Sequence, residues 1–514
     1  MSVARLSDRV QCDLTYRNYP ARDWTVPRYR GGVRVLDVLI VGGGQGGLAT
    51  AFGLKLERIT NIRIVDRNPR GREGPWRRFA RMKELRTPKE VWGIDFGIPS
   101  LTTRAWYEAR FGRAAWERID RFSPQVWREY LDWYRDVLDL PVENEVEVIS
   151  IEPVGDFLRA QLRRKKRIER VLARKIVLAT GIEGNGAWQA PPALVAGLPP
   201  GRYAHSADAI DFHRLKGKRV GVLGAGASAF DNAAAALEAG AASVDLCFRR
   251  LAIPRVNPQI WMNFEGMLGH FAELSDLERW RFMRHIMQEL PVPPPQEAFW
   301  RCRRFENFRW HPNCDWRSAR EHGNTAVVET KKRAFTFDFL IFATGFVTDL
   351  AARRELAPIA DHIALWRDRF TPPPGEESDL LARHPYLGPA FEFTERTPGT
   401  AAFLSRLHDF TLGAMPSIGL TGAAITGMRY GVPRLVNGVA RDLFREDAAD
   451  LYQDLLAFDV PELETLESAS TWIDRLAADA LAGSQRLLAS MKRSSSRRSN
   501  GKKRSKSKLM ALPD

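Results

Sequence analysis

The chain has 514 residues, of which 44% are hydrophobic and 27% charged, and its formal net charge is +15. This length and composition allow about three domains with sizeable cores. Residues 1–20 lack the apolar run of a secretory signal, and no run of about 18 apolar residues is present to span a bilayer. We therefore expect a soluble, cytoplasmic protein.

The positive charge is concentrated near the C-terminus. Residues 492–514 contain nine Lys and Arg and one acidic residue, which gives them a net charge of +8. Residues 485–514, rich in Ser, Lys and Arg, predict a disordered basic tail, which is either idle or contacts nucleic acid or acidic membrane. The high isoelectric point is thus largely a property of the tail, and it does not mark the folded body as a nucleic-acid binder.

The cysteines are few and widely spaced. Cys12, Cys247, Cys302 and Cys314 form no C-x-x-C pair, and no spacing is typical of a zinc site or a disulfide framework. The sequence therefore argues against flavoproteins that reduce disulfides through a close cysteine pair, and we expect no metal.

After a polar lead-in segment, residues 1–34, the stretch Val35–Asp66 has the pattern strand, glycine-rich turn, helix, strand. Gly42, Gly44 and Gly47 have G-x-G-x-x-G spacing. They would allow a tight turn, the approach of a pyrophosphate and close helix packing. Asp66 ends the second strand, where a carboxylate can accept a hydrogen bond from a ribose hydroxyl. We interpret this stretch as a dinucleotide site; a structural turn is the alternative.

Residues 76–140 predict a helical insertion rich in aromatic residues. Trp127, Tyr130, Leu131 and Tyr134 have the spacing of one helix face. Core packing explains most of these aromatics. The exception is Trp76, in the run Gly-Pro-Trp just beyond Asp66, which could wall a planar cofactor.

Residues 145–180 predict a β-meander with a charged hairpin tip at Arg163–Arg167. The meander ends in Ala-Thr-Gly at Gly181, and a later strand within residues 337–346 ends in the same tripeptide at Gly345. Two such strand ends suggest two chain crossings between the same two domains. Glycine at each would allow backbone contact with a cofactor.

A second strand–turn–helix–strand pattern lies between the two crossings. Gly224, Gly226 and Ala229 repeat the motif, and the strand that follows ends in Arg249-Arg250 rather than in an acid. A 2′-phosphate favours such charge-assisted donors. The first site therefore suits FAD and the second NADPH, with a solvated strand end as the alternative reading of the arginines.

These motifs resemble the class B flavoprotein monooxygenases, a superfamily that includes flavin-containing monooxygenases, Baeyer–Villiger monooxygenases and N-hydroxylases. The residues Gly224–Asp231, with Ser228, are similar to the family's NADPH motif, and Gly201 and His205 match part of its F-x-G-x-x-x-H fingerprint. Pro199 stands in place of its phenylalanine, so the subfamily stays open.

The resemblance implies an α/β fold with two Rossmann-like dinucleotide-binding domains, the FAD domain being interrupted by the NADPH domain. The expected boundaries are residues 35–181 and 337–484 for the FAD domain and 182–336 for the NADPH domain. The implied cofactors are FAD and NADPH, and the implied cofactor-binding residues are Gly42, Gly44, Gly47, Asp66, Trp76, Gly181, His205, Gly224, Gly226, Ser228, Ala229, Arg249, Arg250 and Gly345.

The implied function is an NADPH-consuming monooxygenase that uses O2 and oxygenates a small organic substrate through a peroxyflavin. Because a flavin carries the hard chemistry, no catalytic side chain is named. Two alternatives stay open: an NADPH-dependent flavin reductase or oxidase that oxygenates no substrate, and a redox-sensing flavoprotein. The sequence names neither the substrate nor the oligomeric state.

Overall fold

The computed structural model describes residues 1–20, 22–90, 93–420, 424–463 and 474–482. The predicted basic tail, residues 485–514, lies outside the described residues. The chain divides into two compact units, residues 1–448 and 449–514. The first, which we call the body, holds all the strands found in the described residues. None of the described helices is long and apolar enough to cross a membrane.

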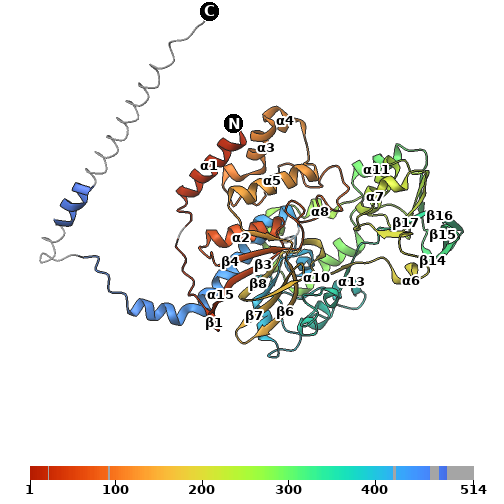
Figure 1. Cartoon of the computed structure of the whole chain (residues 1–514). Helices are drawn as coiled ribbons and strands as arrows, with labels where there is room; N and C mark the ends of the chain where they lie inside the picture. Colours follow the sequence, from red (N-terminus) through yellow and green to blue (C-terminus); the bar gives the residue numbers. More distant parts are fainter. Residues whose placement is uncertain (21, 91–92, 421–423, 464–473, 483–514) are drawn as a thin grey trace, which may run out of the picture. The chain divides into compact units, whose positions relative to one another are not determined.

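A seven-stranded sheet forms around the first glycine motif (Figure 1). Five of its strands, β3, β4, β5, β8 and β19, are parallel, and β6 and β7 add an antiparallel hairpin to β8. The strand order is β5-β4-β3-β8-β7-β6, with β19 on the far part of β8. The bounds are β3 (Leu36–Val41), β4 (Ile62–Asp66), β5 (Val142–Asn144), β6 (Glu147–Val154), β7 (Phe157–Arg164), β8 (Arg167–Leu178) and β19 (Leu407–Asp409).

The predicted meander is confirmed, with its tip at Lys165-Lys166 between β7 and β8. β8 pairs with three strands along its length. Its first half pairs with β7, and its last residues pair with β3 on one side and β19 on the other. The last six residues of β8 are fully buried, as expected for a strand covered on both faces.

Helices α2 (Gln45–Leu56), α3 (Thr103–Phe111), α4 (Arg113–Arg118) and α5 (Pro124–Val137) belong to this part of the body. The helical, aromatic-rich insertion is confirmed by α3, α4 and α5. Trp127, Tyr130, Leu131 and Tyr134 are at most 2% exposed, so the predicted face is buried. The lead-in segment contains a helix that the sequence reading did not anticipate, α1 (Val3–Tyr16), which buries Leu6, Val10 and Leu14.

The second glycine motif lies in a five-stranded parallel sheet of order β10-β17-β11-β12-β13. Helix α7 (Ala227–Glu238) packs on β11 and β12 and against α11 (Gln296–Arg303). The bounds are β10 (Tyr203–His205), β11 (Arg219–Leu223), β12 (Ser243–Phe248), β13 (Phe308–Pro312) and β17 (Phe339–Phe342). A separate antiparallel sheet contains β14 (Trp316–His322), β15 (Thr325–Thr330) and β16 (Ala334–Phe337).

Two features differ from the expected boundaries of the second domain. Strand β17 pairs with β10 and β11, so the five-stranded sheet continues to Phe342, beyond the boundary expected at residue 336. Residues 258–289, with α8 (Pro258–Trp261), α9 (Glu265–His270) and α10 (Asp276–Arg284), pack not on this sheet but in a cluster with Trp366, Leu381 and Met415. Apolar packing with a segment far along the chain decided this, and no local pattern could show it.

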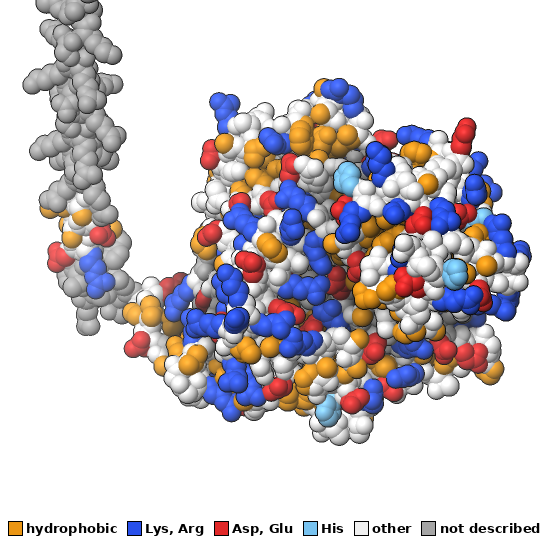
Figure 2. Space-filling model, turned by 45° about the vertical axis from the view of Figure 1, so that its right-hand side comes forward, with side chains coloured by type: hydrophobic (Ala, Val, Ile, Leu, Met, Phe, Trp, Pro, Cys, Tyr) orange, Lys and Arg blue, Asp and Glu red, His pale blue; other side chains and the backbone are white. Residues whose placement is uncertain are grey.

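The remaining elements complete the body. They are the short helices α6 (Pro192–Val195), α12 (Trp366–Arg369), α13 (Asp379–Ala382) and α14 (Met415–Ile418), and two ribbons formed by β1 (Tyr29–Arg30) with β2 (Val33–Arg34) and by β9 (Gly186–Trp188) with β18 (Phe346–Thr348). The long helix α15 (Met428–Leu456) belongs to the body up to residue 448, and its last residues belong to the second unit. On the face of the body shown in Figure 2, basic side chains are spread among acidic and apolar ones rather than gathered in one patch.

Candidate cofactor sites

The first glycine turn joins β3 to α2, and each of its three motif glycines is explained by a different feature of the surroundings. Gly42 has φ +114, and a Cβ there would lie 2.4 Å from the Ala179 carbonyl oxygen. At Gly47, a Cβ would lie 1.8 Å from the Gly42 carbonyl oxygen. A Cβ at Gly44 would meet no atom closer than 3.9 Å, so open space lies over the α2 N-terminus. The first N–H groups of a helix have no acceptor within the helix, so this position suits a pyrophosphate.

Asp66 is 6% exposed at the end of β4. One carboxylate oxygen accepts from the Gly43 N–H at 2.8 Å, and the other accepts from the Asn68 N–H at 2.7 Å and from the Asn68 amide at 2.9 Å. The carboxylate thus holds the glycine turn against β4 while lining the same cavity. A carboxylate can accept about four hydrogen bonds, so these contacts leave capacity for a ribose hydroxyl.

A buried acidic residue, Glu73, anchors the loop that carries Trp76 to helix α5. The fully buried Glu73 side chain pairs with Arg128 at 3.3 Å and with Arg135 at 3.1 Å, both on α5. Gly74 then has φ +73, and Trp76 follows at the cavity wall. The helical insertion therefore positions the loop beyond the glycine turn as well as packing aromatics.

A cavity of about 160 Å³ opens above these elements. It collects five of the predicted residues, Gly42, Gly44, Asp66, Trp76 and Gly181. Sequence reasoning missed the others that line it, which include Gln45, Arg67, Asn68, Arg78, Val146, Val148, Thr180, Glu183, Arg353, Glu355 and Phe410. Some of these follow directly on a predicted motif, so position along the chain was a usable signal. For Arg353, Glu355 and Phe410 the sequence carried no such signal. These residues are far along the chain from the glycine motif and reach the cavity only through the fold.

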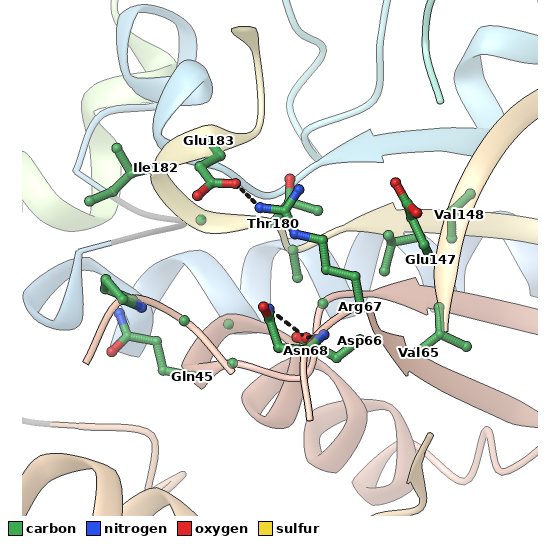
Figure 3. Close-up of a pocket in the computed structure, with 18 of the residues that line it drawn as sticks. Gln45, Val65, Asp66, Arg67, Asn68, Glu147, Val148, Thr180, Ile182 and Glu183 are labelled. Atoms are coloured by element: carbon green, nitrogen blue, oxygen red, sulfur yellow. Dashed lines mark hydrogen bonds and ion pairs between the residues drawn. The ribbon is translucent and has the colours of Figure 1, made fainter. Parts of the chain in front are cut away.

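An ion pair crosses the cavity. Figure 3 shows Arg67, which follows β4, reaching toward Glu183, which follows β8. Arg78 approaches the same carboxylate at 3.8 Å. Two guanidinium groups therefore face the cavity beside the glycine turn, a charge arrangement that suits a dinucleotide pyrophosphate.

The two Ala-Thr-Gly strand ends lead into chain crossings that lie side by side. After β8 the chain passes through β9 to the second sheet, and after β17 it returns through β18, which pairs antiparallel with β9. Gly181 has φ +72 and Gly345 has φ +86, conformations that favour glycine.

His205 lies against the second crossing. Its Nδ1 accepts from the Ala207 N–H at 3.1 Å, so its Nε2 carries the proton and donates to the Gly345 carbonyl oxygen at 3.2 Å. Burial lowers the pKa of His205. Both ring nitrogens thus have partners inside the chain, and the histidine ties β10 to the returning crossing.

The second glycine turn joins β11 to α7 in the same way as the first. Gly224 has φ +139, and a Cβ there would lie 2.4 Å from the Ala343 carbonyl oxygen. At Gly226, the N-cap of α7, a Cβ would meet no atom within 4 Å. Ser228 is exposed in the first turn of the helix, and Ala229 is fully buried against the sheet. This end of α7 is therefore also open to a phosphate.

Arg249 and Arg250 are exposed directly after β12. Within the described ranges neither guanidinium has an acidic partner, and burial together with the neighbouring Arg249 lowers the pKa of Arg250. Two like charges side by side without a counter-ion favour an anionic ligand. Elsewhere in the described ranges, no group of three or more His, Cys, Asp and Glu is placed to hold a metal ion.

Comparison with known proteins agrees with this geometry. A family model described as pyridine nucleotide-disulphide oxidoreductase matches residues 39–265. The ornithine N-hydroxylase of Kutzneria sp. 744 superposes with a TM-score of 0.61 at 17% identity, covering 79% of this chain and 99% of that one. The ornithine hydroxylase of Pseudomonas aeruginosa also gives 0.61, at 15% identity, covering 80% of this chain and 100% of that one. These two structures share the fold.

A curated relative is much more similar in sequence. The FAD-dependent urate hydroxylase of Xanthomonas campestris is 43% identical over 464 residues, which cover 90% of this chain and 97% of that protein. The chain belongs to the class B flavoprotein monooxygenases. It is an FAD- and NADPH-dependent monooxygenase of a small organic substrate. This confirms the resemblance, the α/β fold with Rossmann-like sheets, the cofactors and the reaction class predicted from the sequence.

Proposed function

We propose that the substrate of this monooxygenase is urate or a closely related oxopurine. The observation that carries the proposal is the 43% identity to a urate hydroxylase over nearly the whole of that protein. In such a reaction NADPH supplies two electrons, one oxygen atom of O2 enters the purine and the other leaves as water. Bound FAD would supply the redox chemistry. The protein would bind and orient the substrate and the nucleotides and exclude water from the site.

The residue assignments belong to the same proposal. FAD would lie in the cavity at Gly42, Gly44 and Asp66, with Gly47 shaping the turn, Trp76 at the wall and Gly181 at the first crossing. NADPH would lie at Gly224, Gly226 and Ser228 on α7, with Arg249 and Arg250 on its 2′-phosphate. The open space over both helix N-termini supports this placement.

The domain limits follow from these placements. The FAD domain would comprise residues 35–181 and the part beyond Phe342, with which residues 258–289 pack, and the NADPH domain would comprise the rest of residues 182–342. His205 and Gly345 would then act at the boundary, where they hold the two crossings and do not touch the nucleotide.

The test is NADPH oxidation by the FAD-saturated enzyme with urate, xanthine, ornithine and a simple sulfide, in the presence of catalase. Urate should accelerate NADPH oxidation at least tenfold, and its loss should match NADPH consumption one to one, with label from labelled O2 in the product. Acceleration by ornithine or the sulfide alone would overturn the assignment of substrate. NADPH consumption without loss of any compound, with peroxide detected in parallel reactions that contain no catalase, would instead indicate an oxidase.

A further inference from the structure

Cys247 and Cys314, 67 positions apart in the sequence, are neighbours in the second sheet. Cys247 lies on β12, opposite His311 of β13, and the Cys314 N–H donates to the Phe248 carbonyl oxygen at 2.9 Å. Both side chains are buried in the same apolar cluster. Cys314 lies two residues beyond the end of β13 and is bonded to Phe248, the residue after Cys247, so the two cysteines are close enough in the fold to be considered as a disulfide pair.

The two thiols hydrogen-bond to each other and differ in acidity. This hydrogen bond, together with burial, raises the pKa of Cys247. The same hydrogen bond, supported by the nearby His311, Thr330 and Arg333, lowers the pKa of Cys314. A thiol acidified by a neighbouring thiol and by cationic groups is the type that reacts with oxidants.

The cationic surroundings of Cys314 are held in place by further contacts. His311 Nε2 donates to Asp245 at 2.7 Å, and Arg333 donates to His311 Nδ1 at 3.3 Å. Cys314 is 7% exposed and Cys247 is not exposed. Cys314 is therefore placed to react first with an oxidant. Cys247, buried next to it, would then react with the oxidised Cys314 to form the disulfide.

The segment that carries Cys314 is also bonded to the arginine pair. The Asn313 N–H donates to the Arg250 carbonyl oxygen at 2.8 Å, next to the bond between Cys314 and Phe248. A change in the position of Cys314 would therefore shift the backbone from Phe248 to Arg250, to which this segment is hydrogen-bonded. These residues are the last of β12 and the two that follow it.

We propose that Cys247 and Cys314 are a redox-modification site, which hydrogen peroxide converts to a reversible disulfide that weakens NADPH binding at Arg249 and Arg250. The consequence for NADPH rests on the proposed function of the two arginines; formation of the disulfide does not. Peroxide is what flavin and O2 yield when no substrate is oxygenated, so the site would reduce NADPH consumption when substrate is scarce.

The chemistry balances in two steps. The Cys314 thiolate attacks one peroxide oxygen, an S–O bond forms, the O–O bond breaks, and hydroxide leaves and takes up a proton as water. Cys247, on losing its proton, then attacks the Cys314 sulfur; an S–S bond forms, the S–O bond breaks and a second water leaves. Two thiols are oxidised by two electrons, and one peroxide is reduced to two waters.

The test starts from reduced, FAD-bound enzyme treated with peroxide, blocked with an alkylating agent and mapped by mass spectrometry without reduction. We expect a linked peptide pair containing Cys247 and Cys314, the loss of two titratable thiols, and full recovery with dithiothreitol. In the variant Cys314→Ser, the thiols of Cys247 and Cys302 should both stay free after peroxide treatment. Sulfinic acid at Cys314 without a linked pair, or a disulfide through Cys12 instead, would overturn the proposal.

The second measurement is NADPH affinity, from stopped-flow flavin reduction, before and after peroxide. The NADPH dissociation constant should rise at least threefold in the wild type and in Cys12→Ser, the matched control, and stay constant in Cys314→Ser. A disulfide without a change in affinity would overturn the link to NADPH. The arginine assignment is tested independently by the fully reduced double-alanine variant described below.

Discussion

Two glycines three positions apart in the first turn have opposite surroundings. A side chain at Gly47 would collide with the Gly42 carbonyl, whereas one at Gly44 would point into open space. Gly44 also has φ −78 and ψ −169, a conformation open to any residue. Folding therefore requires glycine at position 47 and does not require it at position 44, so we attribute Gly44 to ligand binding.

Gly44→Ala should fold normally and purify largely without FAD, because its methyl group occupies the space where the pyrophosphate meets the backbone. The measurement is the flavin-to-protein absorbance ratio, with the thermal midpoint of the FAD-free protein as a check on folding. Gly47→Ala is the matched control and should lower stability or prevent folding. Full flavin occupancy in Gly44→Ala would show that the first site is assigned wrongly.

Replacing both Arg249 and Arg250 by alanine should weaken NADPH binding by about 10- to 100-fold, because a charged hydrogen bond contributes roughly 1.5–3 kcal/mol and each 1.4 kcal/mol is tenfold. NADH binding should change little. The maximal rate of flavin reduction should also change less than the affinity, since contacts far from the hydride contribute mainly uniform binding. Flavin reduction by stopped flow, at several concentrations of each nucleotide, measures both. Equal constants for NADPH and NADH in the wild type would remove the basis of this prediction.

At the scale of elements, β19 brings a buried acid to the end of β8. Asp409 pairs in register with Leu178 and is not exposed. One carboxylate oxygen accepts from the Asn185 amide at 2.6 Å, and the other has no partner among the described residues. Burial raises the pKa of Asp409 to about 6, opposed by Thr411, Asn185 and Arg353.

The raised pKa of Asp409 fixes the direction in which the stability of the enzyme changes with pH. The folded protein holds the proton more tightly than the unfolded chain, whose carboxyl has a pKa of 3.8. The stability that Asp409 contributes is therefore present below about pH 4 and is lost as the pH rises through about 6. The span of about two units corresponds to about 3 kcal/mol.

Asp409→Asn should remove this pH dependence. Compared with the variant, the FAD-saturated wild type should gain thermal stability as the pH falls from 7 to 5. Differential scanning fluorimetry at matched ionic strength measures the midpoints. Asp361→Asn, at a fully exposed side chain, is the control and should follow the wild type. Parallel curves for wild type and Asp409→Asn would contradict the raised pKa.

At the scale of the whole molecule, a loop beside the first site is bonded to the second sheet. Arg81 donates to the Ser206 carbonyl oxygen at 2.5 Å and to the Asp208 carbonyl oxygen at 2.6 Å, just beyond β10. Arg301 of α11 donates back to the Arg81 carbonyl oxygen at 3.2 Å. These bonds connect the parts of the body that carry the two glycine motifs.

Arg81→Ala should slow flavin reduction at saturating NADPH by about tenfold or more, because hydride transfer depends on the relative placement of the two nucleotides. The NADPH dissociation constant should change less, since Arg81 donates to backbone carbonyls. Arg81→Lys should recover only part of the rate, because one ammonium cannot reproduce the two-pronged contact. Arg214→Ala, at an exposed arginine in the short 3-10 helix between β10 and β11, is the control. An unchanged maximal rate in Arg81→Ala would show that this bridge does not position the nucleotides.

Much of the fold and part of the first site could be predicted from the sequence. Strand, turn and helix follow one another locally in both motifs, and a positive φ at Gly42 or Gly224 needs glycine whatever surrounds it. The helix face of α5 was equally readable, because its periodicity records burial. The end of the second sheet was not, since β17 resembles any buried strand until its partners are known.

By itself, the sequence determined the two glycine turns, the crossings at Gly181 and Gly345, the contrast between Asp66 and the arginine pair, and the class of enzyme, because each depends on neighbours along the chain. Only the tertiary structure decided that Arg67 meets Glu183 across the cavity, that β19 brings Phe410 to it, and that Cys247 lies beside Cys314. The physical reason is that these contacts join segments whose local conformations are compatible with many arrangements. Burial of apolar surface among distant strands selects the one that forms.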